Sequence, residues 1–235
     1  MLKSIKAQIP NTITCLNLLS GCMACILAFK SQDTFGSLLG YQWAFLCIAA
    51  AALFDFCDGA AARLLHLYSL VGKELDSLAD LISFGLAPAL LMFNTISFFN
   101  PGSWVAYLAL IIVVFGALRL AKFNVDELQV TSFRGLPIPA NALFWIGICS
   151  WIQMKNFYPG DLLIGFLLVG MSFLMITNLR MFSLKFKNFN WRENVKRYAI
   201  LIAAALFIIT TGIAGLAWTI CFYILLSVLS LNKDE

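Results

Sequence analysis

The stretch DLLIGFLLVGMSFLMI, residues 161–176, begins with one aspartate and is otherwise almost wholly apolar. A second stretch, YLALIIVVFGAL (107–118), carries no charge at all. The core of a soluble protein does not need such continuous apolar runs. A helix that crosses the hydrocarbon of a bilayer does need them, over about 20 residues. These runs therefore predict membrane-spanning helices.

The whole composition agrees with these two runs. Hydrophobic residues make up 61% of the 235 residues and charged residues 12%, whereas soluble domains have about 45–50% and about 25%. No polar stretch is long enough to form a separate soluble domain. We therefore expect one integral membrane domain over residues 1–235, an all-α polytopic helical bundle, and no nucleic-acid partner.

Apolar stretches place the candidate spans at 11–29, 41–65, 75–99, 103–121, 138–156, 160–180 and 197–231. The last stretch would be roughly 50 Å long as one helix, which is too long for a single crossing. Its middle, TTGIAG (210–215), has the glycines and β-branched residues of a tight turn. We therefore predict two helices there and eight membrane helices in total.

The distribution of basic residues predicts the orientation. With the N-terminus inside, 14 of the 16 Lys and Arg residues fall on inner segments, and only Lys30 and Lys155 fall outside. Cytoplasmic segments carry such an excess of positive charge. We expect both termini to be cytoplasmic, in the cell (inner, cytoplasmic) membrane.

Four carboxylates interrupt the apolar pattern in DFCDGAAARLLHLYSLVGKELDSLAD (55–80). Asp55 and Asp58 are three residues apart on one predicted helix, and Asp76 and Asp80 are four apart on the next. Both spacings place the two carboxylates on one helix face. The short connection makes the helices antiparallel neighbours at the cytoplasmic surface, so the two faces can meet.

Four convergent carboxylates repel one another unless a cation neutralises them. Hard divalent cations such as Mg²⁺ or Mn²⁺ prefer oxygen ligands, and two such ions can stabilise both oxygens of a phosphoryl transfer. Gly59 and Gly72 let a substrate approach the backbone, and Arg63 can pair with a phosphate. The alternative is that these acids lie at helix ends in interfacial water.

The residues Asp55-x-x-Asp58-Gly59-x-x-Ala62-Arg63, eight residues, Gly72-x-x-x-Asp76-x-x-x-Asp80 resemble the signature of the CDP-alcohol phosphotransferases. These membrane enzymes transfer a phosphatidyl or similar group from a CDP-activated donor to an alcohol and release CMP. The resemblance implies two divalent cations, with Asp55 and Asp76 bridging both. It also implies that Asp58 completes the first metal site, and that Asp80 completes the second and acts as general base.

The same resemblance implies a set of donor-binding residues. Gly59 and Arg63 match positions that contact the CDP group, Ser69 matches a position whose hydroxyl contacts the nucleotide, and Gly72 belongs to the same signature. PNTIT (10–14) resembles a motif whose Asn11 and Thr14 would line the cytidine pocket. Asparagine and threonine after proline are also typical of an ordinary helix N-terminus.

Flanking stretches resemble the phosphatidylserine synthase branch of this family: DSLADLISFGLAPALL (76–91), ALRLAKFNV (117–125), FRGLPIPANA (133–142) and LMITNLRMFSLK (174–185). The resemblance implies CDP-diacylglycerol as donor, L-serine as acceptor and a homodimer. A serine carboxylate needs a cation, and Arg119, Arg134 and Lys122 are the candidates. Each can instead serve the positive-inside pattern.

Two alternatives stay open at this point. The same chemistry can use glycerol 3-phosphate or inositol phosphate as acceptor, since Arg119, Lys122, Arg134 and Arg180 can form a basic pocket for a phosphate. An ion or proton-coupled transporter can also use intramembrane carboxylates. A transporter predicts acids throughout the bilayer depth, whereas here they cluster at one edge.

Overall fold

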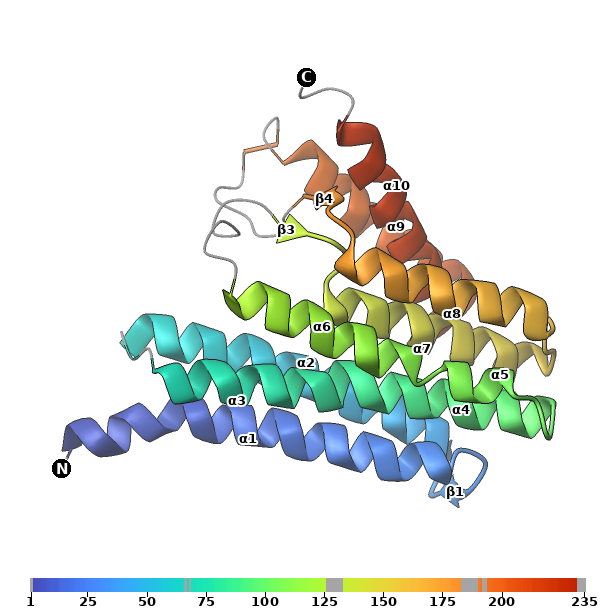
Figure 1. Cartoon of the computed structure of the whole chain (residues 1–235), viewed down its shortest axis with the longest axis horizontal. Helices are drawn as coiled ribbons and strands as arrows, with labels where there is room; N and C mark the ends of the chain where they lie inside the picture. The colour runs from blue at the N-terminus through green and yellow to red at the C-terminus, as the bar shows by residue number, and fades with distance from the viewer. Residues whose placement is uncertain are drawn as a thin grey trace.

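The computed structural model describes residues 2–65, 67, 69–125, 133–182, 190–191 and 194–231, and helices make up most of it (Figure 1). This confirms the all-α class. Two antiparallel strand pairs join helix ends: β1 (Thr34–Phe35) with β2 (Leu38–Leu39), and β3 (Phe133–Arg134) with β4 (Arg180–Met181). The α-helices are α1 Leu2–Phe29, α2 Gly40–Leu65, α3 Leu70–Asp80, α4 Ala87–Phe99, α5 Val105–Leu108, α6 Ile111–Val125, α7 Ile138–Lys155, α8 Asp161–Ile176, α9 Val195–Thr211 and α10 Gly215–Leu231.

Most helices begin and end within a few residues of the predicted spans, but α1 does not. It begins at Leu2 and contains Pro10, so Asn11 lies inside the helix. The interpretation of Asn11 as part of a helix N-terminus is therefore wrong. One turn further along α1, the Thr14 hydroxyl lies 3.0 Å from the Pro10 carbonyl oxygen.

Five helical stretches of the described residues are long and apolar enough to cross a membrane. Their outer surfaces are apolar too: Leu53 is 60% exposed and Ile209 is 82% exposed. An apolar exterior of this kind suits lipid rather than water. The stretches are Gln8–Phe29, Gly40–Leu65, Leu70–Phe99, Val105–Val125 and Val195–Leu229, with the shorter Asp161–Ile176 in addition.

The long C-terminal stretch is broken where the sequence predicts a turn. Helix α9 ends at Thr211, a 3₁₀ turn covers Gly212–Ala214, and α10 begins at Gly215. Gly212 has φ 65°, a conformation that favours glycine. A Cβ on Gly215 would collide with the Phe207 backbone, so a glycine is also needed where the two helices meet. The hairpin of two helices is confirmed, while the total of eight crossings stays a prediction.

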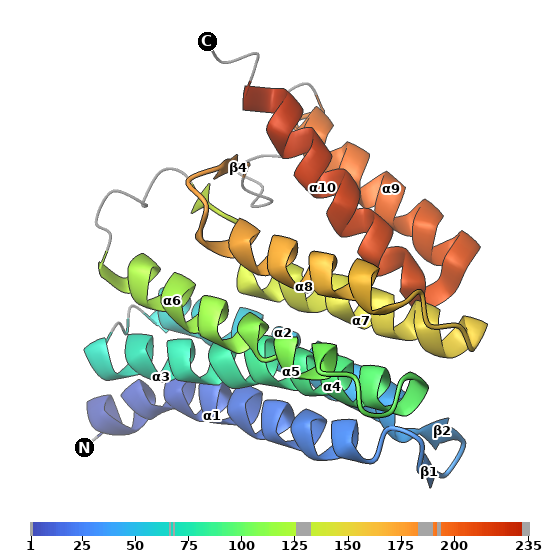
Figure 2. The ribbon, with the colours of Figure 1, turned by 45° about the vertical axis from the view of Figure 1, so that its right-hand side comes forward.

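The helices are arranged in layers along the long axis of the molecule (Figures 1 and 2). Helix α1 packs against α2, α3 and α4, and α7 packs against α10. Figures 1 and 2 show the α9–α10 hairpin inclined across the other layers, on the side away from α1. The β1–β2 hairpin lies at one end of the bundle, and the α2–α3 connection lies at the other.

Helices α3 and α4 form one continuous helical rod with a π-helical turn, Leu81–Leu86, between them. The turn begins directly after Asp80, and π turns inside α-helices are frequent at functional sites. It packs against α1, α6 and α7. The rod therefore carries two of the four aspartates, Asp76 and Asp80, directly before a turn that is packed among other helices.

Candidate active site

Three of the four aspartates come together between α2 and α3. Asp55, Asp76 and Asp80 each offer a carboxylate oxygen, and these three oxygens all lie within 4.8 Å of one another. The i, i+4 spacing of Asp76 and Asp80 puts both on one face of α3, the face that Asp55 of α2 approaches. All three side chains are half-buried, so their charges are only partly screened by solvent.

Asp58 is more deeply buried, with 6% of its surface exposed. Its Oδ2 accepts a hydrogen bond from the Thr14 hydroxyl on α1 (2.7 Å). It does not belong to the group of three oxygens. Its predicted role as a metal ligand therefore stays a prediction, and the predicted donor-binding residue Thr14 contacts a predicted metal ligand.

The aspartate group fits a divalent cation on structural grounds. Asp76 Oδ1 is buried and has no hydrogen-bond partner among the described residues. An unpartnered buried carboxylate oxygen is costly unless a cation or donor satisfies it. Three converging carboxylates supply the hard oxygen ligands that Mg²⁺ and Mn²⁺ require.

Three of the predicted donor-binding residues, Asn11, Ser69 and Gly72, lie together at the start of α3. Ser69 precedes this helix, and its hydroxyl accepts a hydrogen bond from the Gly72 amide (2.9 Å), as an N-cap residue does. A Cβ on Gly72 would lie 2.9 Å from both Asn11 Oδ1 and Ser69 Oγ. Gly72 thus leaves room for polar groups of α1 and α3 to meet.

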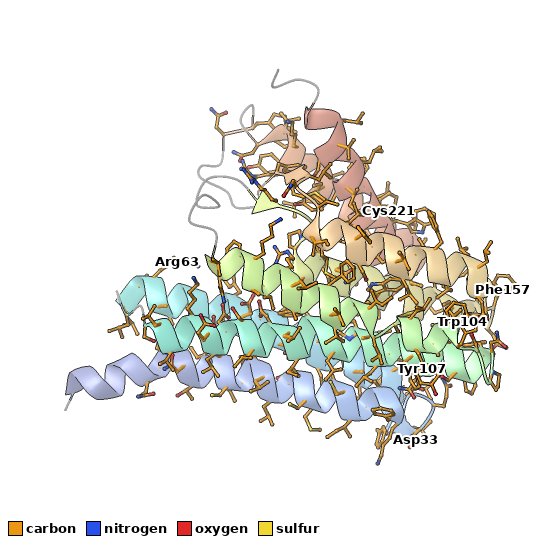
Figure 3. All side chains as sticks on the ribbon, in the orientation of Figure 1. Asp33, Arg63, Trp104, Tyr107, Phe157 and Cys221 are labelled. Carbon is orange, nitrogen blue, oxygen red and sulfur yellow. The ribbon has the colours of Figure 1, made fainter. Side chains whose placement is uncertain are left out.

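Arg63 reaches back along α2 over Gly59. A Cβ on Gly59 would lie 3.9 Å from both terminal nitrogens of Arg63, an ordinary contact distance. Packing within this chain therefore does not by itself require glycine there. Figure 3 shows Arg63 near the end of the bundle where α2 ends. His66, which follows in the sequence, lies outside the described residues.

The three predicted serine-binding residues gather at one pocket. Arg119 and Lys122 reach it from α6 and Arg134 from β3, and residues 175–177 at the end of α8 form another wall. The Lys122 ammonium donates to Asn178 Oδ1 (3.2 Å). Arg180, named as a further cation for a phosphate acceptor, lies on β4 opposite Arg134.

Arg119 connects this pocket with the aspartates. Its side chain is close enough to interact electrostatically with Asp80 and with Tyr223 of α10. Its buried Nε has no hydrogen-bond partner among the described residues. Tyr223 is held in turn, because its hydroxyl donates to the Phe182 carbonyl (3.0 Å). The C-terminal hairpin thus contributes a residue near the pocket.

Sequence reasoning missed two polar residues beside Asp80. The Asn17 amide donates to Asp80 Oδ1 (3.3 Å), and the Ser83 hydroxyl donates to Asn17 Oδ1 (2.7 Å). A signal for Asn17 is present in the sequence, since Asn11, Thr14 and Asn17 recur every three residues in an otherwise apolar helix. No comparable pattern marks Ser83.

A helical membrane protein with converging carboxylates and a nearby basic pocket is suited to phosphoryl-group transfer. Comparison with known proteins specifies the class: the model of the CDP-alcohol phosphatidyltransferase family matches residues 7–228. The chain belongs to this family, and it is a transferase. This excludes the transporter alternative.

Curated relatives carry a more specific name. The CDP-diacylglycerol–serine O-phosphatidyltransferase of Methanocaldococcus jannaschii is 34% identical over 214 residues, covering 91% of this chain and 88% of the relative. The protein of the same name from Helicobacter pylori is 32% identical over 201 residues, covering 82% and 78%. That from Bacillus subtilis is 37% identical over 137 residues, covering 58% and 73%.

Proposed function

We propose that this chain transfers the phosphatidyl group of CDP-diacylglycerol to the hydroxyl of L-serine, giving phosphatidylserine and CMP. The observation that carries the proposal is the group of Asp55, Asp76 and Asp80 oxygens within 4.8 Å of one another, linked through Arg119 to a basic pocket. The names of the relatives support serine as the acceptor.

In this reaction the serine oxygen forms a bond to the β-phosphorus of the donor. The bond between that phosphorus and the oxygen bridging to CMP breaks, and CMP leaves with the electron pair. Asp80 takes the hydroxyl proton of serine as general base. Asp80 suits this role because its carboxylate belongs to the group of three and also interacts electrostatically with Arg119 of the basic pocket.

Two divalent cations, Mg²⁺ or Mn²⁺, are part of the proposal. Asp55 and Asp76 would hold both ions, Asp58 would complete the first site, and Asp80 the second. The unpartnered Asp76 Oδ1 supports this assignment. When bound, such ions stabilise the negative charge that develops on the phosphoryl oxygens.

The donor is proposed to bind along α1, α2 and the start of α3. Its CDP group would contact Gly59, Arg63, Ser69, Gly72, Asn11 and Thr14. The cluster of Asn11 and Ser69 around Gly72 supports this arrangement, because hydroxyl and amide groups there can bind a nucleotide. The acyl chains of the donor would lie in the surrounding membrane lipid.

For the acceptor, we assign the serine carboxylate to the pocket of Arg119, Lys122 and Arg134. Arginine binds carboxylates through two parallel hydrogen bonds. A phosphate-bearing acceptor, glycerol 3-phosphate or inositol phosphate, is the second candidate, because three cations at one pocket also suit a dianion. An active site at the cytoplasmic face of the cell membrane and a homodimer complete the proposal.

The test is CMP release by the purified protein with CDP-diacylglycerol, Mg²⁺ or Mn²⁺, and one acceptor at a time. We expect release with serine only. Release with glycerol 3-phosphate or inositol phosphate instead would favour the second candidate, and none with any acceptor would overturn the proposed activity. Asp33→Asn is the matched control, since Asp33 is an exposed acid at the other end of the bundle (Figure 3).

A further inference from the structure

Asn17 and Ser83 form a fully buried polar pair next to Asp80. Both side chains have 0% of their surface exposed. The Ser83 hydroxyl lies 2.7 Å from Asn17 Oδ1 and 3.1 Å from the Asn17 carbonyl oxygen. Buried polar groups are costly unless they are hydrogen-bonded. Here the bonds within the pair also determine the direction of the amide.

The pair fixes which end of the Asn17 amide faces Asp80. Because Asn17 Oδ1 accepts from Ser83, its NH₂ group points the other way and donates to Asp80 Oδ1 (3.3 Å). This hydrogen bond to Oδ1 restricts the rotation of the Asp80 carboxylate. Its other oxygen is then left to face a metal ion or the acceptor hydroxyl.

Backbone geometry places the pair at this position. A Cβ on Gly21 would lie 2.8 Å from Ser83 Cα and would collide with Ser83 Oγ. Only glycine therefore allows α1 to approach the turn this closely. Ser83 belongs to the π-helical turn Leu81–Leu86 that begins directly after Asp80, so this turn carries the serine to the asparagine.

We infer that Asn17 is a positioning residue of the metal site, which orients the Asp80 carboxylate, and that Ser83 sets the orientation of the Asn17 amide. The inference rests on the proposed role of Asp80 as a metal ligand. Partners that orient metal ligands contribute about 10- to 100-fold to metal affinity or activity. A role limited to packing α1 against α3–α4 would instead affect only the folded fraction of the protein.

The experiment measures Mn²⁺ binding to metal-free purified protein by electron paramagnetic resonance, with no substrate present. We expect Asn17→Leu to raise the Mn²⁺ dissociation constant about 10- to 100-fold. Ser83→Ala should raise it by a smaller factor, and Ser83→Cys, which keeps a weak donor, should fall between Ser83→Ala and the unchanged chain. The same order is expected in the Mn²⁺ concentration that gives half-maximal CMP release.

Two matched variants control for the loss of a polar group. Asn94→Leu removes an amide of α4 whose hydrogen bond is to Leu90 of its own helix. Ser172→Ala removes a buried hydroxyl of α8 that has no partner among the described residues. Both should bind Mn²⁺ as the unchanged chain does.

The outcomes separate this inference from the proposed function. Unaltered Mn²⁺ affinity in the Asn17 and Ser83 variants, with only a lower melting temperature, would overturn the positioning role and leave the proposed function standing. Failure of the unchanged chain itself to bind Mn²⁺ would overturn the metal site. If Asn17→Leu does not fold, the graded Ser83 variants give the answer.

Discussion

Asp80 has a different set of neighbours from Asp58 and Asp76. It accepts a hydrogen bond from Asn17 and lies within electrostatic range of Arg119. Asp58 is instead bonded to Thr14, and Asp76 has an unpartnered oxygen. Residues of one chemical type thus have different environments, which suits different roles in one reaction.

Asp80→Asn is expected to abolish turnover while leaving donor binding largely intact. General-base catalysis contributes about 10²- to 10⁴-fold, and an amide cannot take the serine proton. The measurements are CMP release and the binding of CDP-diacylglycerol by the same preparation. A parallel loss of donor binding would instead assign Asp80 a mainly metal-holding role.

Arg119→Gln is expected to raise the KM for serine about 10- to 100-fold. A hydrogen bond to a charged group contributes about 1.5–3 kcal/mol, and about 1.4 kcal/mol corresponds to a factor of ten. The KM for CDP-diacylglycerol should change little. Lys155→Gln, at the end of α7, is the matched control, and an unchanged serine KM for Arg119→Gln would remove this residue from the acceptor site.

At the scale of elements, hydropathy predicts where the helices lie. The hydrogen bonds between helices depend on contacts between distant segments, which hydropathy does not predict. Apolar runs and the glycines of 210–215 were sufficient to predict the bounds of α2 and the α9–α10 hairpin. The Ser83–Asn17 bond joins residues 66 positions apart, so no local pattern could predict it. The π turn likewise has no sequence signature in LISFGL.

The aspartate spacing was the most informative part of the sequence, because i, i+3 and i, i+4 pairs share a helix face. It predicted the meeting of Asp55 with Asp76 and Asp80. It could not predict that Thr14 would bond to Asp58, since this depends on how α1 is placed against α2. The pocket of Arg119, Lys122 and Arg134 was anticipated by residue type, and the part of α8 in its wall was not.

The α9–α10 hairpin gives a test at this scale. Gly215→Ala should lower stability by about 1–3 kcal/mol, the range for overpacking, because the added methyl group would collide with the Phe207 backbone. Gly170→Ala is the control, since a Cβ there meets nothing within 4 Å. Thermal unfolding in detergent measures both, and equal melting temperatures would contradict the close packing of α9 against α10.

For the whole molecule, exposed aromatic side chains mark one end of the bundle. Figure 3 shows Trp104, Tyr107 and Phe157 at the end away from Arg63, and these side chains are 69%, 66% and 56% exposed. Exposed Trp and Tyr side chains are typical of a membrane–water interface. Four of the basic residues from which the membrane orientation is predicted lie outside the described residues: Lys185, Lys187, Arg192 and Lys233.

Orientation is testable with single cysteines. In right-side-out vesicles, a membrane-impermeant maleimide should label Asp33→Cys and should label Glu74→Cys only after the membrane is opened. Both positions are exposed, and they precede α2 and lie in α3 respectively. The unchanged chain, with its seven cysteines, measures the background. Labelling of Glu74→Cys in intact vesicles would reverse the predicted orientation.

Metal binding should stabilise the whole fold. A ligand at 100 times its dissociation constant contributes about 2.7 kcal/mol to the folded state. Adding Mn²⁺ to chelator-treated protein should therefore raise the melting temperature, and chelation should abolish CMP release. Asp33→Asn should keep this shift and Asp76→Asn should lose most of it. A shift that survives in Asp76→Asn would place the ion elsewhere.

The π turn after Asp80 affects which changes of sequence this protein can tolerate. Each residue of an α-helix rotates the chain by about 100°, so one residue more or less in the turn changes the angular phase between α3 and α4. Helix α3, which carries Asp76 and Asp80, and helix α4, which packs in the core, can thus face different directions although they form one rod. Deleting a single residue of the turn would turn α4 relative to the carboxylates, whereas substitutions within α4 would leave them in place.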